Sequence, residues 1–216
     1  MSPGIDPAGF IRENLTLKPA PSVREISLYT AHPASGLTRL AGTDEDDEPP
    51  YWAYPWGGGI VLARHILDNP QIVRGRRVLD LGAGGGIVAI AAAKSGAAKV
   101  LAGEVDRVGR AALALNAEAN GVAVEIIEND LLFGPPPPVD LILVGDLFYE
   151  QALARRVVAF LDRCVESGIE ALVGDPGRTT LPRSRLTTLA EYPTPDFGQP
   201  GSEQRPAAVF AFRPPR

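Results

Sequence analysis

VLDLGAGGG (78–86) is the stretch that decides the fold, because three alternating glycines directly follow a short apolar strand and open a helix. Gly82, Gly84 and Gly86 allow a sharp turn and a close approach of a ligand to the backbone. The stretch therefore fits either a ligand-binding loop or a merely tight strand-to-helix turn. Its G-x-G-x-G spacing differs from the G-x-G-x-x-G of dinucleotide-binding loops. Asp80, near the end of the strand, suits a ligand with an amino group rather than a pyrophosphate.

Strands and helices alternate on both sides of this loop. Short apolar strands are expected at 77–81, 99–104, 124–128, 139–145 and 169–174. Helices are expected at 59–69, 87–96, 107–120 and 150–166. This alternation predicts an α/β fold with a mostly parallel sheet covered on both faces. Two late apolar segments, 185–192 and 206–213, predict a closing hairpin that adds an antiparallel edge.

Residues 1–50 have a different pattern, and we predict an N-terminal extension there. Asp6-Pro7 is a helix-start signal for a short helix to about Leu15. The alternation in EISLYT (25–30) suits a half-buried strand, and 37–40 is expected to pair with it.

An acidic run, DEDDE (44–48), and Pro49-Pro50 then disfavour regular structure. We place a boundary there, so that residues 51–216 form the second domain. The acidic run is either a solvated linker or a landing surface for a basic substrate.

Composition narrows the possible functions. The 216 residues are 45% hydrophobic, and the 21 basic and 26 acidic residues balance once the five acids of 44–48 are set aside. Because basic runs interleaved with aromatic residues are absent from the sequence, we expect no nucleic-acid partner. No apolar run approaches the roughly 20 residues of a membrane span, and no signal-peptide pattern opens the chain, so we expect a cytoplasmic protein that has no membrane partner. His32, His65 and Cys164 are too few for a Cys/His zinc site, and no metal is expected.

Acidic residues follow the strands on either side of the loop. Glu104 stands 22 residues after Gly82, about where a carboxylate would reach the ribose hydroxyls of a nucleoside, unless it is only a solvated strand end. Asp106 competes for this role, but its place before a helix explains it better as an N-cap. Asn129 and Asp130 end the next strand, where Asp130 either accepts the exocyclic amine of adenine or shapes a turn. These positions predict one crevice at the carboxyl edge of the sheet.

Together these motifs resemble the seven-strand S-adenosylmethionine-dependent methyltransferases over about residues 56–216. The resemblance implies a Rossmann-like seven-stranded sheet with an inserted antiparallel strand, and S-adenosylmethionine as the cofactor. It places Asp80 and Gly82 near the methionine portion of the cofactor. By the same resemblance the predicted cofactor-binding set is Trp56, Asp80, Gly82, Gly84, Glu104 on the ribose, Asn129, and Asp130 near adenine.

The substrate end is predicted from Asp146, Phe148 and Tyr149, a carboxylate followed by two aromatic residues after the fourth strand. An aromatic wall suits an alkylammonium, because a ring face attracts the cation and contacts its methylene stem. The alternative is that Phe148 and Tyr149 only cap the core.

Three separated motifs give a narrower resemblance: PPYWAYPWGGG (49–59), the DxFY of 146–149 and GDPGR (174–178). They resemble protein-lysine methyltransferases of the electron transfer flavoprotein β-subunit type over about three quarters of the chain. The resemblance implies methyl transfer to a lysine ε-amine, with that β-subunit as the expected protein substrate. It places Trp56 at the border of the cofactor pocket, Asp146 at the target lysine, and Phe148 or Tyr149 along the lysine channel.

Other functions stay open at this point. Ribosomal-protein lysine methyltransferases have a similar domain, but their usual signature has Asn where this chain has Asp146, which favours the flavoprotein type. A nicotinamide-dependent oxidoreductase could use the same crevice. A non-catalytic module of the same fold is disfavoured by the intact Gly82, Gly84 and Glu104.

Overall fold

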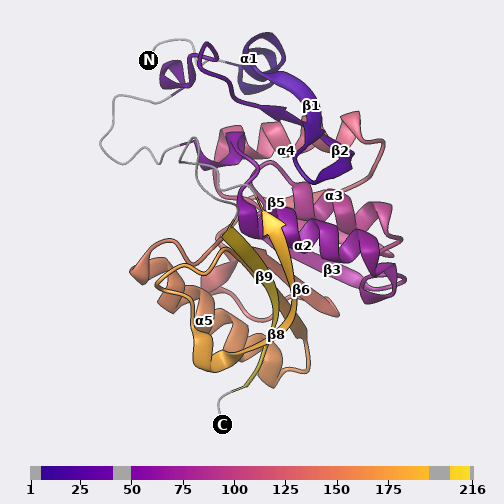
Figure 1. The fold of residues 1–216 in the computed structure, drawn as a ribbon, viewed down its shortest axis with the longest axis vertical. Coiled ribbons are helices and arrows are strands. Elements are labelled where there is room, and N and C mark those ends of the chain that lie inside the picture. The colour runs from indigo at the N-terminus through magenta and orange to yellow at the C-terminus, as the bar shows by residue number, and fades with distance from the viewer. Residues whose placement is uncertain (1–5, 41–49, 195–204, 215–216) are drawn as a thin grey trace.

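The computed structural model describes residues 6–40, 50–194 and 205–214, and in these ranges a seven-stranded sheet forms the centre of the molecule (Figure 1). The strand order across the sheet is β5-β4-β3-β6-β7-β9-β8. The strands are β3 (Arg77–Leu81), β4 (Lys99–Gly103), β5 (Glu125–Ile127), β6 (Leu141–Gly145), β7 (Glu170–Asp175), β8 (Leu186–Thr194) and β9 (Arg205–Phe212). The five central strands overlap the five predicted segments, which confirms the predicted α/β sheet.

The closing hairpin differs in one respect from the prediction. β9 pairs antiparallel with both β7 and β8, so it lies between them and is the inserted antiparallel strand of the described sheet. The edge strand β8 consequently runs in the same direction as β7. The inserted antiparallel strand that the family resemblance implies is confirmed. The antiparallel edge expected from the hairpin pattern alone is wrong, because the chain first passes to the edge and then returns.

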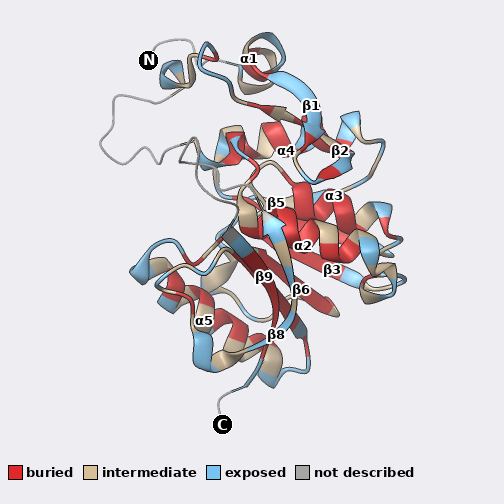
Figure 2. Cartoon of the chain, viewed as in Figure 1, coloured by how far each residue is buried: buried red, intermediate tan, exposed pale blue. Residues whose placement is uncertain are grey.

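Helices cover both faces of the sheet. They are α2 (Gly57–Asp68), α3 (Ile87–Lys94), α4 (Arg107–Ala119) and α5 (Gln151–Glu166). Successive side chains of a strand point to opposite faces, and Val78 and Leu79 accordingly belong to different apolar clusters. The cluster of Val78 includes buried residues of α2 and α3, and the cluster of Leu79 includes those of α5 (Figure 2).

The N-terminal residues form a helix and a hairpin. Asp6 caps α1 (Pro7–Asn14) by accepting from the N–H groups of Ala8 and Gly9 at 3.1 and 3.0 Å, as predicted. β1 (Thr16–Ala20) pairs antiparallel with β2 (Val23–Thr30), which contains the predicted strand 25–30.

The predicted partner of that strand, 37–40, is wrong. Leu37–Arg39 is a 3₁₀ helix that follows Gly36 at φ +61°, and the actual partner is β1. β1 contains Pro19, which argues against a central strand but is tolerated in an edge strand of a two-stranded sheet.

The N-terminal elements pack on the rest of the chain. Phe10 and Ile11 of α1 share an apolar cluster with Trp52, Ala112 and Leu115. Apolar residues of β2 join the main cluster under α2 and α3, namely Val23, Ile26 and Leu28. The acidic run 44–48 lies outside the described residues. The hairpin thus stands beside α4, close to the edge of the sheet where a ligand would bind (Figure 1).

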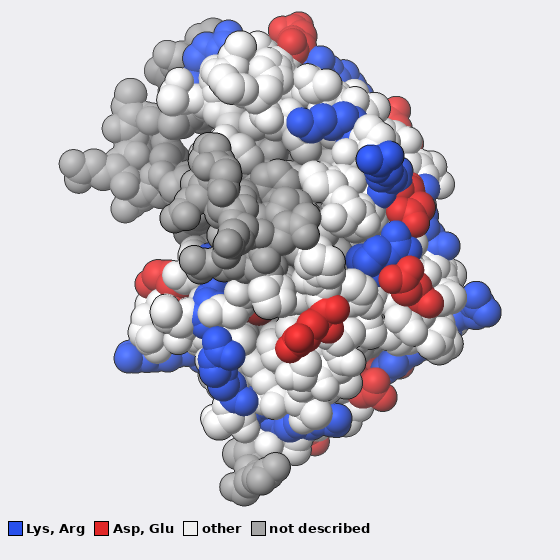
Figure 3. Space-filling model, viewed as in Figure 1, with Lys and Arg blue, Asp and Glu red and all other residues white. Residues whose placement is uncertain are grey.

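On the face shown in Figure 3, basic and acidic side chains are interspersed. None of the helices in the described ranges is both long and apolar enough to cross a membrane. The predicted cytoplasmic location stays a prediction.

Candidate functional site

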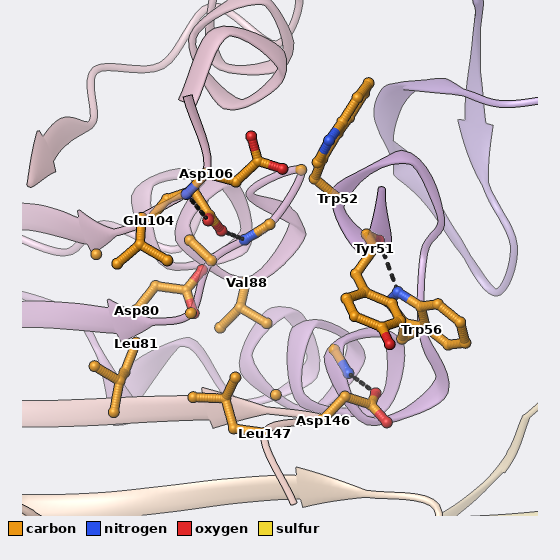
Figure 4. Close-up of a pocket in the computed structure, with 18 of the residues that line it drawn as sticks. Tyr51, Trp52, Trp56, Asp80, Leu81, Val88, Glu104, Asp106, Asp146 and Leu147 are labelled. Carbon is orange, nitrogen blue, oxygen red and sulfur yellow. Dashed lines mark hydrogen bonds between the residues drawn. The ribbon is translucent and has the colours of Figure 1, made fainter. Parts of the chain in front are cut away.

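A cavity of about 510 Å³ opens at the carboxyl ends of β3, β4, β5 and β6. Its volume lies in the range of small-molecule sites, roughly 300–1,000 Å³. It is bordered by the glycine loop, by residues of β2 and by the segment 51–56 (Figure 4). Nine of the predicted site residues line it: Trp56, Asp80, Gly82, Gly84, Glu104, Asn129, Asp130, Asp146 and Tyr149. The predicted convergence on one crevice is confirmed.

The glycine loop presents its backbone to this cavity. Gly82, Gly84 and Gly86 have φ of +68°, +52° and +84°, in the left-handed region that favours glycine. A Cβ on Gly82 would lie 2.5 Å from a methyl group of Leu147, so Gly82 permits close packing. A Cβ on Gly84 would meet, among the described atoms within 4 Å, only Cα of Trp52 at 3.6 Å. The space in front of Gly84 is therefore open for a ligand.

Glu104 is tied to this loop. Its Oε2 accepts from the Gly84 N–H at 2.6 Å and its Oε1 from the Asp106 N–H at 2.8 Å (Figure 4). Glu104 is 9% exposed, and this burial raises the pKa of its carboxyl. Because each carboxylate oxygen has a second lone pair, Glu104 keeps acceptor sites for a ligand.

Asp106 caps α4, as predicted. Its Oδ1 accepts from the N–H groups of Val108 and Gly109 at 2.7 and 3.2 Å. This confirms the N-cap interpretation and leaves Glu104 as the predicted ribose ligand.

Asp80 is a buried carboxylate with one unused oxygen. Its Oδ2 accepts from the Ala89 N–H at 2.9 Å, whereas its Oδ1 has no hydrogen-bond partner among the described residues. Burial raises the pKa of Asp80 to about 7, and the nearby Glu104 acts in the same direction. An unsatisfied buried acceptor beside a cavity fits a ligand that carries positive charge or N–H groups.

Asp130 has two partners in the chain. Its Oδ1 accepts from the Leu132 N–H at 2.9 Å, which caps the 3₁₀ helix Leu131–Phe133, and its Oδ2 pairs with Arg156. The turn interpretation of Asp130 is therefore confirmed. Asn129 and Asp130 also line the cavity, and their contact with adenine stays a prediction.

Asp146 holds three segments together. Its Oδ2 accepts from the N–H groups of Gly58 and of Gly59 (3.1 Å), at the start of α2. Its Oδ1 accepts from Nη2 and Nε of Arg178, in the loop after β7, at 2.7 and 3.1 Å. Burial raises the pKa of Asp146, while Arg178 and the two glycine N–H groups act in the opposite direction. The residue also has φ +59°, which is unusual for a residue with a side chain.

The aromatic wall contains Tyr149 as expected, but not Phe148. Phe148 is fully buried, in the apolar cluster that includes Phe160 of α5, and the described lining of the cavity does not include it. Its assignment to the site is corrected, because the side chain points into the core beneath α5. Tyr149 does line the cavity, with its ring centroid 5.2 Å from that of Tyr51, which in turn lies 6.0 Å from Trp56.

Sequence reasoning missed several residues around the cavity. Arg178 belongs to the GDPGR motif, but the motif alone assigns it no role. Asn116 of α4 is fully buried and donates to the carbonyl of Gly85 at 2.8 Å. A polar residue on the otherwise apolar face that contains Ala112 is the signal that could have drawn attention to it.

Residues 62–145 match the family of ribosomal protein L11 methyltransferase (PrmA). The electron transfer flavoprotein beta subunit lysine methyltransferase of Rattus norvegicus is 41% identical over 172 residues, which are 76% of this chain and 68% of the rat protein. That of Xenopus laevis is 39% identical over 196 residues, 88% of this chain and 80% of the frog protein. The chain belongs to the electron transfer flavoprotein beta subunit lysine methyltransferase family.

Solved structures agree with this methyltransferase on the fold. The ribosomal protein L11 methylase of Lactobacillus delbrueckii subsp. bulgaricus superposes with a TM-score of 0.52 at 19% identity, over 78% of this chain and 91% of the other. TrmN of Thermus thermophilus gives 0.53 at 22% identity, over 72% and 48%. Family membership confirms an S-adenosylmethionine-dependent protein-lysine methyltransferase and favours it over a nicotinamide-dependent oxidoreductase.

Proposed function

We propose that this lysine methyltransferase acts on lysine ε-amines of the electron transfer flavoprotein β-subunit, within the cavity at the carboxyl edge of the sheet. The observation that carries the proposal is that one cavity joins two chemically different ends. A glycine loop with buried carboxylates forms one end, and an aromatic wall beside Asp146 forms the other.

The cofactor end fits S-adenosylmethionine. Gly84 leaves open space, one oxygen of Asp80 has no hydrogen-bond partner within the described ranges, and Glu104 keeps acceptor sites. We assign the cofactor to these residues together with Trp56, Gly82, Asn129 and Asp130. When bound, S-adenosylmethionine supplies an electrophilic methyl group on a sulfonium.

The acceptor end has to present a neutral amine. A lysine has a pKa near 10.4 in water, so deprotonating it at about pH 7.4 costs about 4 kcal/mol. The rings of Tyr51, Trp56 and Tyr149 suit the methylene stem and the amine of a lysine. The guanidinium of Arg178, which also lines the cavity, favours the neutral form of a neighbouring amine.

Asp146 is assigned to orient that amine. The described contacts already fill its four lone-pair positions, two with glycine N–H groups and two with Arg178. The amine can therefore hydrogen-bond to Asp146 only when Arg178 breaks one of its two hydrogen bonds to Oδ1.

The relatives support the flavoprotein subunit over a ribosomal protein. The match to the ribosomal protein L11 methyltransferase family spans 62–145, which includes the glycine loop and Glu104 but not Asp146 or the aromatic wall. The family model of ribosomal protein L11 methyltransferase thus ends before Asp146, whereas the lysine methyltransferases of the flavoprotein type match over most of the chain.

The test is a comparison of two acceptors. The purified protein is incubated with methyl-labelled S-adenosylmethionine and either the flavoprotein β-subunit or ribosomal protein L11. We expect label on the β-subunit, released as methyllysine on hydrolysis, and suppressed by excess unlabelled cofactor. Label on L11 alone, or label in residues other than lysine, would contradict the proposal.

A further inference from the structure

Asn116 links the glycine loop to the N-terminal hairpin. The side chain lies on α4 and is fully buried. Its Nδ2 donates to the Gly85 carbonyl at 2.8 Å, and its Oδ1 accepts from the Tyr29 N–H of β2 at 2.8 Å. One amide thus satisfies a carbonyl of the loop and an N–H of a strand that lies 87 residues earlier.

Asn120, one helical turn later, makes the neighbouring contact to β2. Its Oδ1 accepts from the Ser27 N–H at 3.1 Å, and its Nδ2 donates to the Ser27 carbonyl at 2.7 Å. Residues four apart share a face of a helix, and residues two apart share an edge of a strand. Asn116 and Asn120 therefore bind β2 in the way that a further strand would. Only Asn116 also reaches the loop.

The contact to Gly85 lies at a sensitive point. Gly85 stands between Gly84 and Gly86, both with positive φ. A Cβ on Gly85 would lie 2.9 Å from the Trp52 carbonyl oxygen, so the segment 51–56 closes its other side. Tyr29 and Trp52 line the same cavity as the loop. The loop is thus held by Glu104 through the Gly84 N–H and by Asn116 through the Gly85 carbonyl.

We propose that Asn116 is a positioning residue for cofactor binding, through which the N-terminal hairpin becomes part of the S-adenosylmethionine site. The inference rests on the cofactor assignment but not on the identity of the methylated protein. It requires a side chain with a donor and an acceptor on one short stem, which asparagine provides. An aspartate would keep the acceptor for Tyr29 and turn a second acceptor toward the Gly85 carbonyl.

The test compares Asn116→Asp with Asn120→Asp. Both variants make the same chemical change on the same face of α4 and both face β2, but Asn120 does not contact the loop in the described structure. Calorimetric affinity for S-adenosylmethionine and the thermal midpoint of the cofactor-free protein are measured on each. We expect both variants to melt earlier, and only Asn116→Asp to bind the cofactor more weakly, by about 10-fold, the equivalent of one positioned hydrogen bond.

Equal affinity of Asn116→Asp and the parent, or equal losses in the two variants, would overturn the inference. A parent protein that does not bind S-adenosylmethionine would instead refute the cofactor assignment. If Asn116→Asp does not fold, the inference is tested instead by hydrogen exchange of the backbone amides in the parent protein, with and without S-adenosylmethionine. Cofactor binding should then slow exchange at Tyr29 more than at Ser27, and unchanged exchange at Tyr29 would count against the proposed link.

Discussion

Arg178 and Asp146 form a two-pronged, largely buried ion pair, with Nη2 and Nε of the arginine at 2.7 and 3.1 Å from one oxygen of the aspartate. The side chains are 28% and 8% exposed. The other oxygen takes the N–H groups of Gly58 and Gly59 at the start of α2, where a helix favours negative charge. The charge of Asp146 is therefore neutralised by Arg178 on one side and by the start of α2 on the other. These contacts give Asp146 a structural role that does not depend on a bound lysine.

Asp146→Asn is expected to lower both stability and methyl transfer. Removing one charge of a buried pair leaves Arg178 uncompensated, and such losses amount to about 3 kcal/mol. If Asp146 also orients the lysine amine, transfer per folded molecule should fall by about 100-fold, as for loss of a positioned acid–base group. Thermal unfolding and single-turnover methylation of the β-subunit measure the two effects, and cofactor affinity should change little.

Asp140→Asn is the matched control, since Asp140 pairs with Arg77 at 2.7 Å on a more exposed part of the surface. It should leave the thermal midpoint and methylation close to the parent values. Parent-level transfer by Asp146→Asn, after correction for folded fraction, would limit Asp146 to the structural role.

Gly84→Ala is expected to weaken cofactor binding far more than it weakens the fold. The positive φ of Gly84 makes any side chain cost about 1 kcal/mol, and the added methyl group would stand in the open space in front of the loop. Gly75→Ala provides the control, because Gly75 has φ +73° and its Cβ would meet no described atom within 4 Å. Calorimetry should show lost affinity only for Gly84→Ala. Similar affinities of the two variants would mean that the cofactor does not approach Gly84.

Glu104→Ala is expected to reduce affinity for S-adenosylmethionine by about 1–3 kcal/mol, since it removes buried hydrogen bonds of a charged group. Asp106→Ala should leave the affinity unchanged and lower stability by about 1 kcal/mol through loss of the α4 cap. Titration calorimetry and thermal unfolding on both variants check this division. The reverse result would exchange the two assignments.

Local sequence patterns predicted the elements whose formation depends mainly on residues close together in the chain. The glycine loop, the Asp6 and Asp106 caps, and the strand that contains Asp80 lie where the sequence placed them. The convergence of Asp80 and Glu104 also followed from the sequence, because parallel strands bring their carboxyl ends to one edge.

Contacts between distant segments could not be predicted in this way. Asp146 meets Gly58 across 88 positions, and no periodicity encodes that distance. Phe148 and Tyr149 are adjacent aromatic residues, and only the packing of α5 determines that the first enters the core. Asn116 looks like one more position of an amphipathic helix until the hairpin is folded against it.

Asp80 gives the last prediction, a dependence on pH. Its pKa is raised to about 7 by burial, above the ordinary value of 3.8, so the folded cofactor-free protein is stabilised by protonation of Asp80. That contribution is fully present below about pH 4, falls as the pH rises through about 7, and amounts to about 4 kcal/mol. Asp80→Asn, which is neutral at every pH, should flatten this part of the stability profile in urea unfolding.

Cofactor binding should reverse the preference of Asp80. A cationic ligand beside Oδ1, which has no partner in the part of the chain that the structure describes, favours the ionised carboxylate. Binding near pH 7 should therefore release a proton, and affinity should rise from about pH 6 to about pH 8. Calorimetry in two buffers of different ionisation enthalpy measures how many protons are released when the cofactor binds. Glu104 also has a raised pKa and is present in both proteins, so the difference between the parent and Asp80→Asn isolates Asp80. The same proton count in both would show that Asp80 keeps its protonation state when the cofactor binds.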